Sequence, residues 1–574
     1  MNIFRMKSVK PDSDSSGESF TESTEDKAKR MGRTPMQDLI VRIGSVAVVG
    51  VAVFIAIFSA ETFINGVGFL RTFVTKYCSW WIVLCAFLSL IFCVIIALRY
   101  GKIRLGGPNA KPAFSYFSWV AMLFSTGQGV GLVFWAVAEP IMMQTQMPFV
   151  LQSEGMTSSG ALAWTYFHWA LPAWAIYAIV SLFMAYSRYN RGKDACFRAT
   201  IEDLFPGKSK RVVGVIVEIF VVLAVIFGMT TSLGLASYQF SNGVSRLVGV
   251  EPTLFYVISA LVLFGVISTI AVWLGVVKGI KRVSDANAVI SIVFVILIFI
   301  FGPTLFLCYV FPESIGIFID QFVNMSLFTE PSIALFGIDS YAETWQTFWS
   351  FFIFCWCFAF ATFTAGFVST ISRGRSLREF VMGVVTVPVI VCMIWTLVLG
   401  GSGIFYDIQQ GGLISAQTLN DSSLGLLLTI ESVPIIAPLL VIMALILIAG
   451  YIITTINGGV VALGNFVSTS RKHSRSFNAL LVICIMALAL VFLITAGETF
   501  LTTIQFATVA GGIPFTIIVV MMGVQFFKWV KKDPQLPENA EEPIDPNLGP
   551  DLLAAFAEVG RYPAEVSEDN VDGN

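Results

Sequence analysis

Three glycines occupy alternate positions in the middle of a long apolar run, at Gly127, Gly129 and Gly131. Each glycine weakens a helix by about 0.5–1 kcal/mol, so together they favour a local loss of helix. Unwound backbone at membrane depth is tolerated where it lines a polar cavity. The run, with Gln128 inside it, therefore indicates a binding site for a solute. Close helix packing through small residues is the open alternative, whereas a phosphate-binding loop is dismissed because no strand precedes the run.

Three aromatic residues in the next apolar run, Trp169, Trp174 and Tyr177, share one broad helical face. At about 100° per residue, Trp174 and Tyr177 project at about 140° and 80° from Trp169. Pro172 can bend that face. Rings gathered in this way can hold a quaternary ammonium group by cation–π contacts, worth roughly 0.5–2 kcal/mol each. An aromatic belt at the membrane interface or plain core packing is the alternative.

Hydroxyl and amide oxygens gather in a third apolar run, at Tyr451, Thr454, Thr455 and Asn457, just before Gly458 and Gly459. Sodium is a hard cation that takes such oxygens as ligands. The run therefore predicts a sodium site, and the alternative is that the threonines hydrogen-bond to their own helix.

Few titratable residues lie inside apolar runs. His168 could relay protons or hydrogen-bond to a neighbouring helix. Glu139, next to Pro140, and Glu218 are interpreted as gate, cap or interface residues rather than a proton path. No run carries paired carboxylates, a Ser/His/Asp set or metal-spaced His and Cys, so we expect no enzyme activity and no cofactor other than a coupling sodium ion.

The elements that position these residues follow from composition. The chain has 574 residues, of which 56% are hydrophobic and 13% charged, and this balance is typical of a membrane protein. A helix needs about 20 apolar residues to cross the hydrocarbon layer. Twelve such runs are predicted: Ile43–Ala60, Ser79–Leu98, Tyr116–Met142, Leu162–Tyr186, Val212–Ser237, Leu254–Val277, Ala286–Val310, Trp345–Ser369, Phe380–Ile404, Pro438–Leu463, Phe477–Ala496 and Ile504–Phe527.

The basic residues predict the orientation. With the N-terminus in the cytoplasm, 32 of the 35 Lys and Arg residues fall on the cytoplasmic side, and only Arg71, Lys76 and Arg246 fall outside. We therefore expect a multi-pass protein of the inner membrane, surrounded by lipid, with both termini cytoplasmic. Residues 1–42 and the acidic tail 531–574 are predicted to be largely disordered around a twelve-span domain, 43–530. A net charge of -2 gives no reason to expect nucleic acid.

Two further features concern architecture. The stretch Glu313–Thr344 is predicted to be external, and its segment Ile315–Phe322 is too short to cross, so we expect it to lie along the interface as a packing or oligomer element. If the first two spans are set aside, ten remain. Two sets of five spans would enter the membrane from opposite sides, which is the arithmetic of inverted repeats.

The sequence also resembles a known family. Ile371–Phe380, with the sequence ISRGRSLREF, is similar to the cytoplasmic loop between spans 8 and 9 of the betaine/choline/carnitine transporters. The alternate glycines, His168 to Tyr177, Thr231 to Leu235 and Gly302 to Thr304 match further motifs in family order.

The resemblance implies a fold like that of the leucine transporter, with spans 3–7 and 8–12 as inverted repeats, in a homotrimer. It implies a secondary transporter that takes up a small zwitterionic or quaternary-ammonium solute with a sodium or proton gradient. Trp169, Trp174 and Tyr177 then correspond to the family's aromatic box. Thr454 and Thr455, with the backbone around Ser125 and Gln128, correspond to one sodium site, to which Tyr451 is added.

The chain departs from the family pattern in span 8. The family signature reads Trp-Thr-x-Phe-x-Trp-x-Trp-Trp, and here Trp356 is followed by Cys357 where the fourth box aromatic is expected. Phe360 replaces another tryptophan. Loss of one ring should weaken trimethylammonium binding by about 1 kcal/mol. Other solutes, of taurine or sulfonium type, exchange of substrate and product, and a transport-inactive sensor remain alternatives.

Two further departures concern ions and regulation. Val225 and Met229 stand where sodium-coupled members have two threonines of a second sodium site, which argues against coupling to two sodium ions. The tail lacks the basic cluster of some osmosensing relatives, because Arg561 is the only cation beyond Lys532.

Overall fold

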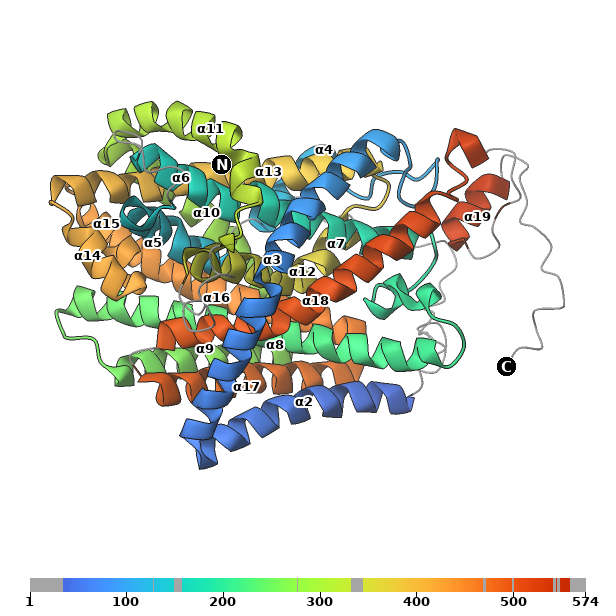
Figure 1. The fold of residues 1–574 in the computed structure, drawn as a ribbon, viewed down its shortest axis with the longest axis horizontal. Helices are drawn as coiled ribbons and strands as arrows, with labels where there is room; N and C mark the ends of the chain where they lie inside the picture. Colours follow the sequence, from blue (N-terminus) through green and yellow to red (C-terminus); the bar gives the residue numbers. More distant parts are fainter. Residues whose placement is uncertain are drawn as a thin grey trace.

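The computed structural model describes residues 35–126, 129–148, 157–275, 277–331, 344–467, 471–497, 500–539, 544 and 548–557. Almost all of the regular structure in these residues is helical, and twelve of the described helices are long and apolar enough to cross a membrane. The predicted all-α membrane fold is therefore confirmed. Figure 1 shows most of the long helices running side by side along the length of the molecule.

The first two spans are joined almost without a loop. Helix α2 covers Pro35–Phe58 and α3 covers Ala60–Arg99, with the Ser59 hydroxyl accepting a hydrogen bond from the Thr62 amide. The 40 residues of α3 extend for about 60 Å at 1.5 Å per residue, so α3 crosses the bundle obliquely (Figure 1). The predicted loop before Ser79 is therefore helix. Residues 35–42 are also helical, which corrects the prediction of disorder up to residue 42.

Two predicted spans are each divided into two helices. The third consists of α4 (Tyr116–Thr126) and α5 (Val130–Gln146), and the fourth of α6 (Thr157–Trp169) and α7 (Leu171–Tyr189). Both divisions lie well inside the predicted runs. Both interruptions therefore lie beside residues that the sequence predicts to bind the solute.

The remaining elements follow in chain order. They are η2 (Arg198–Thr200), η3 (Glu202–Leu204), α8 (Ser209–Val248), α9 (Leu254–Leu274), α10 (Val277–Phe301), α11 (Thr304–Ser326), the π-helix η6 (Thr347–Phe351), α12 (Phe352–Ile371), α13 (Leu377–Gln409), α14 (Leu413–Asn420), η7 (Ser422–Leu424), α15 (Gly425–Glu431), α16 (Ala437–Val467), α17 (Arg471–Ala496), α18 (Phe500–Val530), η9 (Pro537–Asn539) and α19 (Pro550–Ala557).

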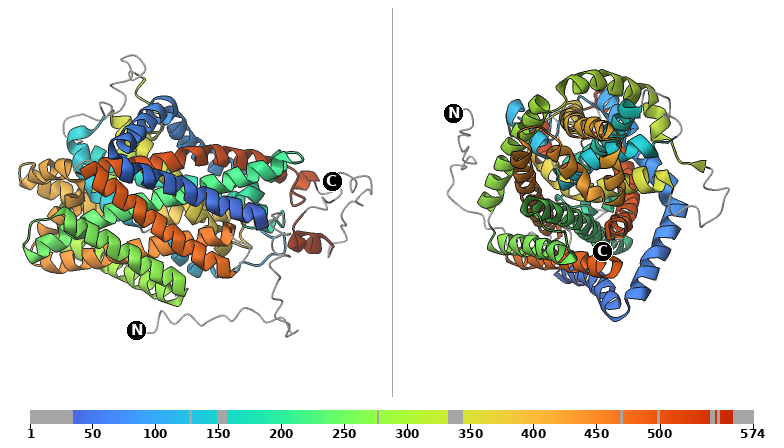
Figure 2. Two further views of the ribbon diagram at one scale, coloured as in Figure 1. Left: turned by 90° about the horizontal axis from the view of Figure 1, so that it is seen from below. Right: turned by 90° about the vertical axis from the view of Figure 1, so that its left-hand side faces the viewer.

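The seventh predicted span ends earlier than expected. Helix α10 stops at Phe301, and α11 starts at Thr304, because Pro303 has no amide hydrogen with which to continue the helix. Helix α11 contains the predicted interfacial segment, but its 23 residues make it long enough to count among the twelve, whereas α4 and α5 are individually too short. Seen end-on, α11 curves along the rim of the bundle (Figure 2).

The start of α2 and the end of α18 lie at the same end of the bundle (Figures 1 and 2). There residues 531–539, the described start of the predicted tail, contact the bundle. Asp533 is fully buried, and its Oδ2 accepts hydrogen bonds from the Tyr186 hydroxyl (2.7 Å) and the Asn190 amide (3.2 Å). Further along, the Gly549 amide donates to the Asn190 carbonyl (3.0 Å).

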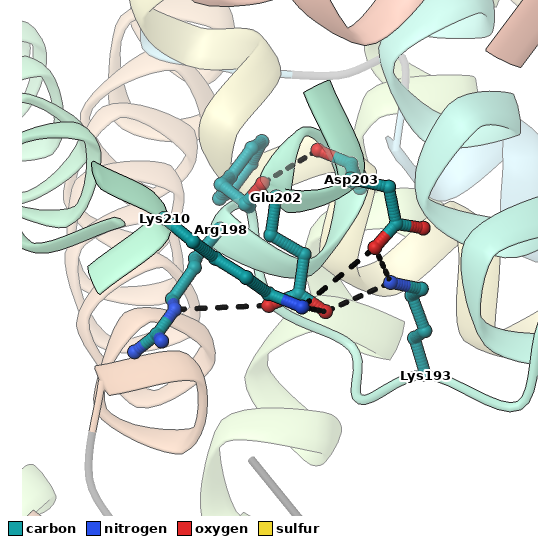
Figure 3. Close-up of polar contacts among 7 residues, drawn as sticks. Lys193, Arg198, Glu202, Asp203 and Lys210 are labelled. Carbon is teal, nitrogen blue, oxygen red and sulfur yellow. Dashed lines mark hydrogen bonds and ion pairs between the residues drawn. The ribbon is translucent and has the colours of Figure 1, made fainter. Parts of the chain in front are cut away.

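The loop from α7 to α8 at this end carries a group of ion pairs, called here the loop ion-pair cluster (Figure 3). Lys193 Nζ lies 2.8 Å from Glu202 Oε1 and 2.7 Å from Asp203 Oδ1. Lys210 Nζ lies 3.6 Å and 3.8 Å from the same two oxygens, and Arg198 Nε lies 3.9 Å from Glu202 Oε2. Two carboxylates therefore share three cations, and they hold the loop against the start of α8.

Candidate solute-binding site

The third span loses its helix where the alternate glycines predict it. Helix α4 ends at Thr126 and α5 begins at Val130, with Gly129 in an extended conformation (φ -159°, ψ 169°). A Cβ atom on Gly129 would meet no heavy atom within 4 Å, so the backbone there borders open space. Gly127, Gln128 and the side chain of Ser125 lie outside the described residues. The predicted break is confirmed, and it leaves main-chain groups beside a space.

The third glycine has a different role. A Cβ atom on Gly131 would lie 2.7 Å from Cη2 of Trp356 and 3.2 Å from Cζ3 of Trp169. The contact with Trp356 is closer than real Cβ atoms tolerate and the contact with Trp169 is tight, so glycine lets the two indoles pack against the backbone of α5. The rings themselves meet edge to face, with centroids 5.7 Å apart and planes at 84°. Gly131 thus brings a ring of the fourth span against a ring of the eighth.

The prediction that the three aromatic residues share one helical face is wrong. Trp169 ends α6 and Leu171 begins α7, with Ala170 between them in a non-helical conformation (φ -102°, ψ -104°). Pro172 is the physical reason, because it has no amide hydrogen to donate to the carbonyl four residues earlier. Trp169 therefore lies on a different helix from Trp174 and Tyr177.

The aromatic residues of α6 and α7 both contact residues of α12. The rings of Trp174 and Tyr177 meet edge to face, with centroids 5.2 Å apart, and the Tyr177 hydroxyl shares a hydrogen bond with the Cys357 thiol. Trp356, the neighbour of Cys357, contacts Trp169 as described above and stacks on Phe352 at 5.6 Å. Trp169, Trp174 and Tyr177 thus lie beside the first turns of α12, where Trp356 and the buried Cys357 are found.

A buried polar network adjoins the box. Glu139 and His168 are both 0% exposed, and Glu139 Oε1 lies 2.5 Å from His168 Nδ1. Glu139 Oε2 accepts a hydrogen bond from Trp169 Nε1 at 2.7 Å, and His168 Nε2 lies 2.9 Å from the Ser350 hydroxyl. Sequence reasoning treated Glu139 and His168 separately and missed Ser350. The available signal was the scarcity of titratable residues in the spans, because a buried acid and a buried base are expected to pair.

Ser350 belongs to the π-helix η6, which opens the eighth span. Single π-helical turns are rare and are frequent at functional sites. The network therefore joins the broken third span, the broken fourth span and the irregular start of the eighth.

The predicted sodium ligands are only partly brought together. The Thr454 hydroxyl donates to the carbonyls of Gly450 (2.9 Å) and Tyr451 (3.1 Å), which is the back-bonded arrangement, although its lone pairs remain acceptors. Thr455 is buried on the same helix. The Tyr451 hydroxyl instead meets the Ser291 hydroxyl of α10 at 2.6 Å, so it is directed to another helix.

The two apolar residues at the place of a second sodium site are buried. Val225 and Met229 are 2% and 1% exposed, and a Cβ atom on Gly459 would lie 2.5 Å from Cε of Met229. A thioether packed against α16 supplies no hard oxygen ligand.

A separate groove of about 420 Å³ is lined by residues of α3, α7, α12 and α18. Its walls are mostly apolar, and Lys528 and Lys531 stand at one end. None of the box residues lines it. The groove is therefore distinct from the aromatic site.

A helical membrane bundle whose third span is broken beside converging aromatic rings has the construction of a solute transporter. Comparison with known proteins agrees. Residues 40–535 match BCCT, the betaine/carnitine/choline family transporter, so the chain belongs to this family of membrane transporters.

Several characterised relatives are similar over most of the chain. The glycine betaine transporter OpuD of Bacillus subtilis (strain 168) is 30% identical over 518 residues, covering 89% of this chain and 98% of that protein. The ectoine/hydroxyectoine transporter of Virgibacillus pantothenticus is 30% identical over 481 residues, covering 82% and 92%. The high-affinity choline transport protein of Escherichia coli (strain K12) is 29% identical over 481 residues, covering 82% and 69%.

Proposed function

We propose that this transporter takes up a small zwitterionic or quaternary-ammonium solute by alternating access, driven by an ion gradient. The observation that carries the proposal is the pair of irregular spans. The break between α4 and α5 and the π-helix before α12 stand in the first span of each proposed inverted repeat, spans 3–7 and 8–12. Interrupted helices at corresponding positions of two repeats are the best structural indication of a transporter binding site.

The proposed binding mode divides the solute between two surfaces. Its ammonium group lies among Trp169, Trp174, Tyr177 and Trp356, where cation–π contacts contribute roughly 0.5–2 kcal/mol per ring. Its anionic end lies at the backbone of Gly129, where the third span is interrupted. Trp356 Nε1 is a further candidate donor, since this buried atom has no hydrogen-bond partner among the described residues.

The solute class follows from the relatives and from Cys357. The relatives transport glycine betaine, ectoine and choline by their names, which supports a compact solute with a cationic group. Cys357 removes one ring of the box and leaves a polar thiol. A less bulky cationic group, as in taurine or a sulfonium compound, is the second candidate, and substrate/product exchange is the alternative mode.

One coupling ion is enough for the proposed uptake. Moving one charge through 100 mV provides about 2.3 kcal/mol, which supports a concentration ratio of roughly fifty. A sodium ion would be held by Thr454 and Thr455 with the backbone around Ser125 and Gln128. We leave Tyr451 out of this set because its hydroxyl is directed to Ser291.

The cellular arrangement is also a proposal. Both termini are placed in the cytoplasm of a cell whose inner membrane holds the protein, in accord with the Lys and Arg distribution. A homotrimer would use α11, whose outward side exposes Leu305, Tyr309 and Ile319 by 70–74%. Large exposed apolar side chains at the rim of a bundle suit contact with lipid or with another subunit.

Uptake into proteoliposomes tests the proposal. Purified protein should accumulate radiolabelled betaine, choline, carnitine, taurine or a sulfonium osmolyte when a sodium or proton gradient is imposed. Acceleration by internal substrate without any response to either gradient would identify an exchanger instead. Binding without flux in either assay would identify a sensor and would refute transport.

A further inference from the structure

Glu139 and His168 form a buried pair that takes no part in the proposed binding of the solute. Both side chains are 0% exposed and lie 2.5 Å apart, in a region of apolar and aromatic side chains. The rings of Trp164, Trp345 and Phe354 have their centroids 5.8–6.0 Å from that of the imidazole. Water is therefore excluded from both groups in this conformation.

Such a pair is neutral in two arrangements. The shared proton lies either on the imidazole, which gives an ion pair, or on the carboxyl, which gives two neutral groups. Loss of that proton leaves one buried carboxylate without a counter-charge, which is strongly unfavourable in a medium of low dielectric constant. The buried pair therefore offers a place for one proton in the interior of the bundle.

Three acidic groups on neighbouring described segments are each hydrogen-bonded to partners other than the pair. Glu313 of α11 accepts a hydrogen bond from Ser159, and Asp407 of α13 accepts from the Ser415 amide at 2.6 Å. Glu330 accepts from the Gln346 amide at 2.8 Å, just before η6. All three are themselves acidic, so they cannot supply a positive charge to a deprotonated pair.

The pair is connected to the solute site through one indole. The Trp169 Nε1–H donates to Glu139 Oε2, while the ring of Trp169 packs edge to face on Trp356. A change in the charge of Glu139 alters the strength of the hydrogen bond that orients this ring, because bonds to charged acceptors are stronger. His168 transmits the same change to η6 through Ser350.

We propose that the Glu139–His168 pair is the site at which this transporter binds a coupling proton, and that Trp169 and Ser350 link its occupancy to the solute site. The proposal rests on the proposed transport function and specifies its coupling ion. In this proposal, binding of the proton and binding of the solute favour the same conformation. By linkage, each then increases the affinity for the other by the same factor.

The experiment uses the full chain in proteoliposomes with equal sodium on both sides. A pH difference of one unit, alkaline inside, should drive accumulation of the solute up to about tenfold for one proton per solute. Glu139→Gln keeps the shape of the side chain but removes its ionisation. This variant should lose proton-driven accumulation and retain solute counterflow. Glu313→Gln, a matched change on α11, should behave as the wild type.

Solute counterflow distinguishes a failure of this proposal from a failure of the proposed transport function. If the wild type exchanges solute but does not respond to the pH difference, or if Glu139→Gln keeps proton-driven accumulation, the pair is not the coupling site. If Glu139→Gln does not fold, Ser350→Ala replaces it, because it only removes the hydrogen bond to His168. Ser350→Ala should shift the pH of half-maximal uptake, and an unchanged pH profile would overturn the proposal. Absence of wild-type counterflow would refute transport itself, and the pair would then lose its role as well.

Discussion

Two groups of charged side chains in this protein use opposite electrostatic arrangements. The loop ion-pair cluster has two carboxylates and three cations, and its acidic side chains Glu202 and Asp203 remain 14% and 34% exposed. The Glu139–His168 pair has one acid and one base, both without any exposure. Water and redundant partners buffer the first group against the loss of any one member. The second group has neither.

Burial makes a charged pair in the centre of a transporter more sensitive to its surroundings than a pair near water. Near water, ion pairs contribute about 0–1 kcal/mol, because solvent already stabilises the separate charges. In the bundle, removing one member of a buried pair costs several kcal/mol, because the remaining charge has neither water nor a partner. A conformational change that admits water therefore alters the pair far more than the cluster.

The largest expected effect is the loss of one member of the buried pair. Glu139→Ala should destabilise the folded protein by about 3–5 kcal/mol, because His168 and Trp169 both lose their carboxylate partner in a dry environment. Thermal melting of the detergent-solubilised protein measures the effect. Replacing both partners, with Glu139→Met and His168→Phe, should recover much of the stability but not proton-driven uptake. Equal melting temperatures for wild type and Glu139→Ala would mean that the buried pair is no more sensitive to the loss of a member than the loop ion-pair cluster.

The second prediction concerns the ring that the pair positions. Gly131→Val should displace Trp356 and Trp169, at an overpacking cost of about 1–3 kcal/mol, and so weaken solute binding about five- to 150-fold. Titration calorimetry measures this change. Gly228→Ala is the matched control, since its Cβ would lie 3.5 Å from that of Ala359, an ordinary contact. Wild-type affinity in Gly131→Val would show that the rings do not depend on this glycine.

Asp533 provides an intermediate case, a buried carboxyl near the membrane surface. Burial raises the pKa of Asp533, while hydrogen bonds from Tyr186, the Gln535 amide and Asn190 partly oppose the shift. The docked tail therefore binds a proton more tightly than the free tail. Docking is fully supported below the ordinary carboxyl pKa of about 4 and weakens as the pH rises through the raised value, by at most about tenfold per pH unit.

Hydrogen exchange of the segment after α18, recorded across this pH range, tests the prediction. Protection should fall as the pH rises, after correction for intrinsic exchange rates. Asp533→Asn cannot ionise and should remove this dependence. Protection that increases with pH would mean that the ionised carboxylate, with its three donors, is the stable form.

The box itself should respond more modestly. Cys357→Trp restores a fourth ring and should tighten binding of betaine-like ligands by about 1 kcal/mol, or roughly fivefold. Calorimetry with betaine and with taurine would detect the change in preference. Cys392→Ala is the control, because it removes a thiol that is hydrogen-bonded to Trp174 but adds no ring. Unchanged or weaker betaine binding in Cys357→Trp would reject the missing-ring argument.

The smallest effect is expected in the loop ion-pair cluster. Lys193→Gln removes one of three cations and should lower stability by about 0.2–1 kcal/mol, less at high salt. Melting curves at low and high salt measure it. A loss comparable to that of Glu139→Ala would mean that the cluster is not buffered by its neighbours.

Much of the site could be predicted from residue types, but not its connections. The break at Gly129 follows from local glycine energetics, and the division before Leu171 was missed only because Pro172 was read as a bend. The contacts of His168 with Glu139 and Ser350 join residues 29 and 182 positions apart in the chain. No periodicity connects such positions, because the partners belong to three separate spans.

Local chemistry along the chain was sufficient to establish the membrane class, the twelve apolar spans and the weak point of the third helix, since hydropathy and helix propensity depend on neighbouring residues. Only the tertiary structure decided that Trp169, at the end of α6, contacts Trp356, that Cys357 pairs with Tyr177, and that Glu139 has a base beside it. These outcomes depend on which helices pack together, because packing sets both the distance between side chains and the free energy of burying a charge.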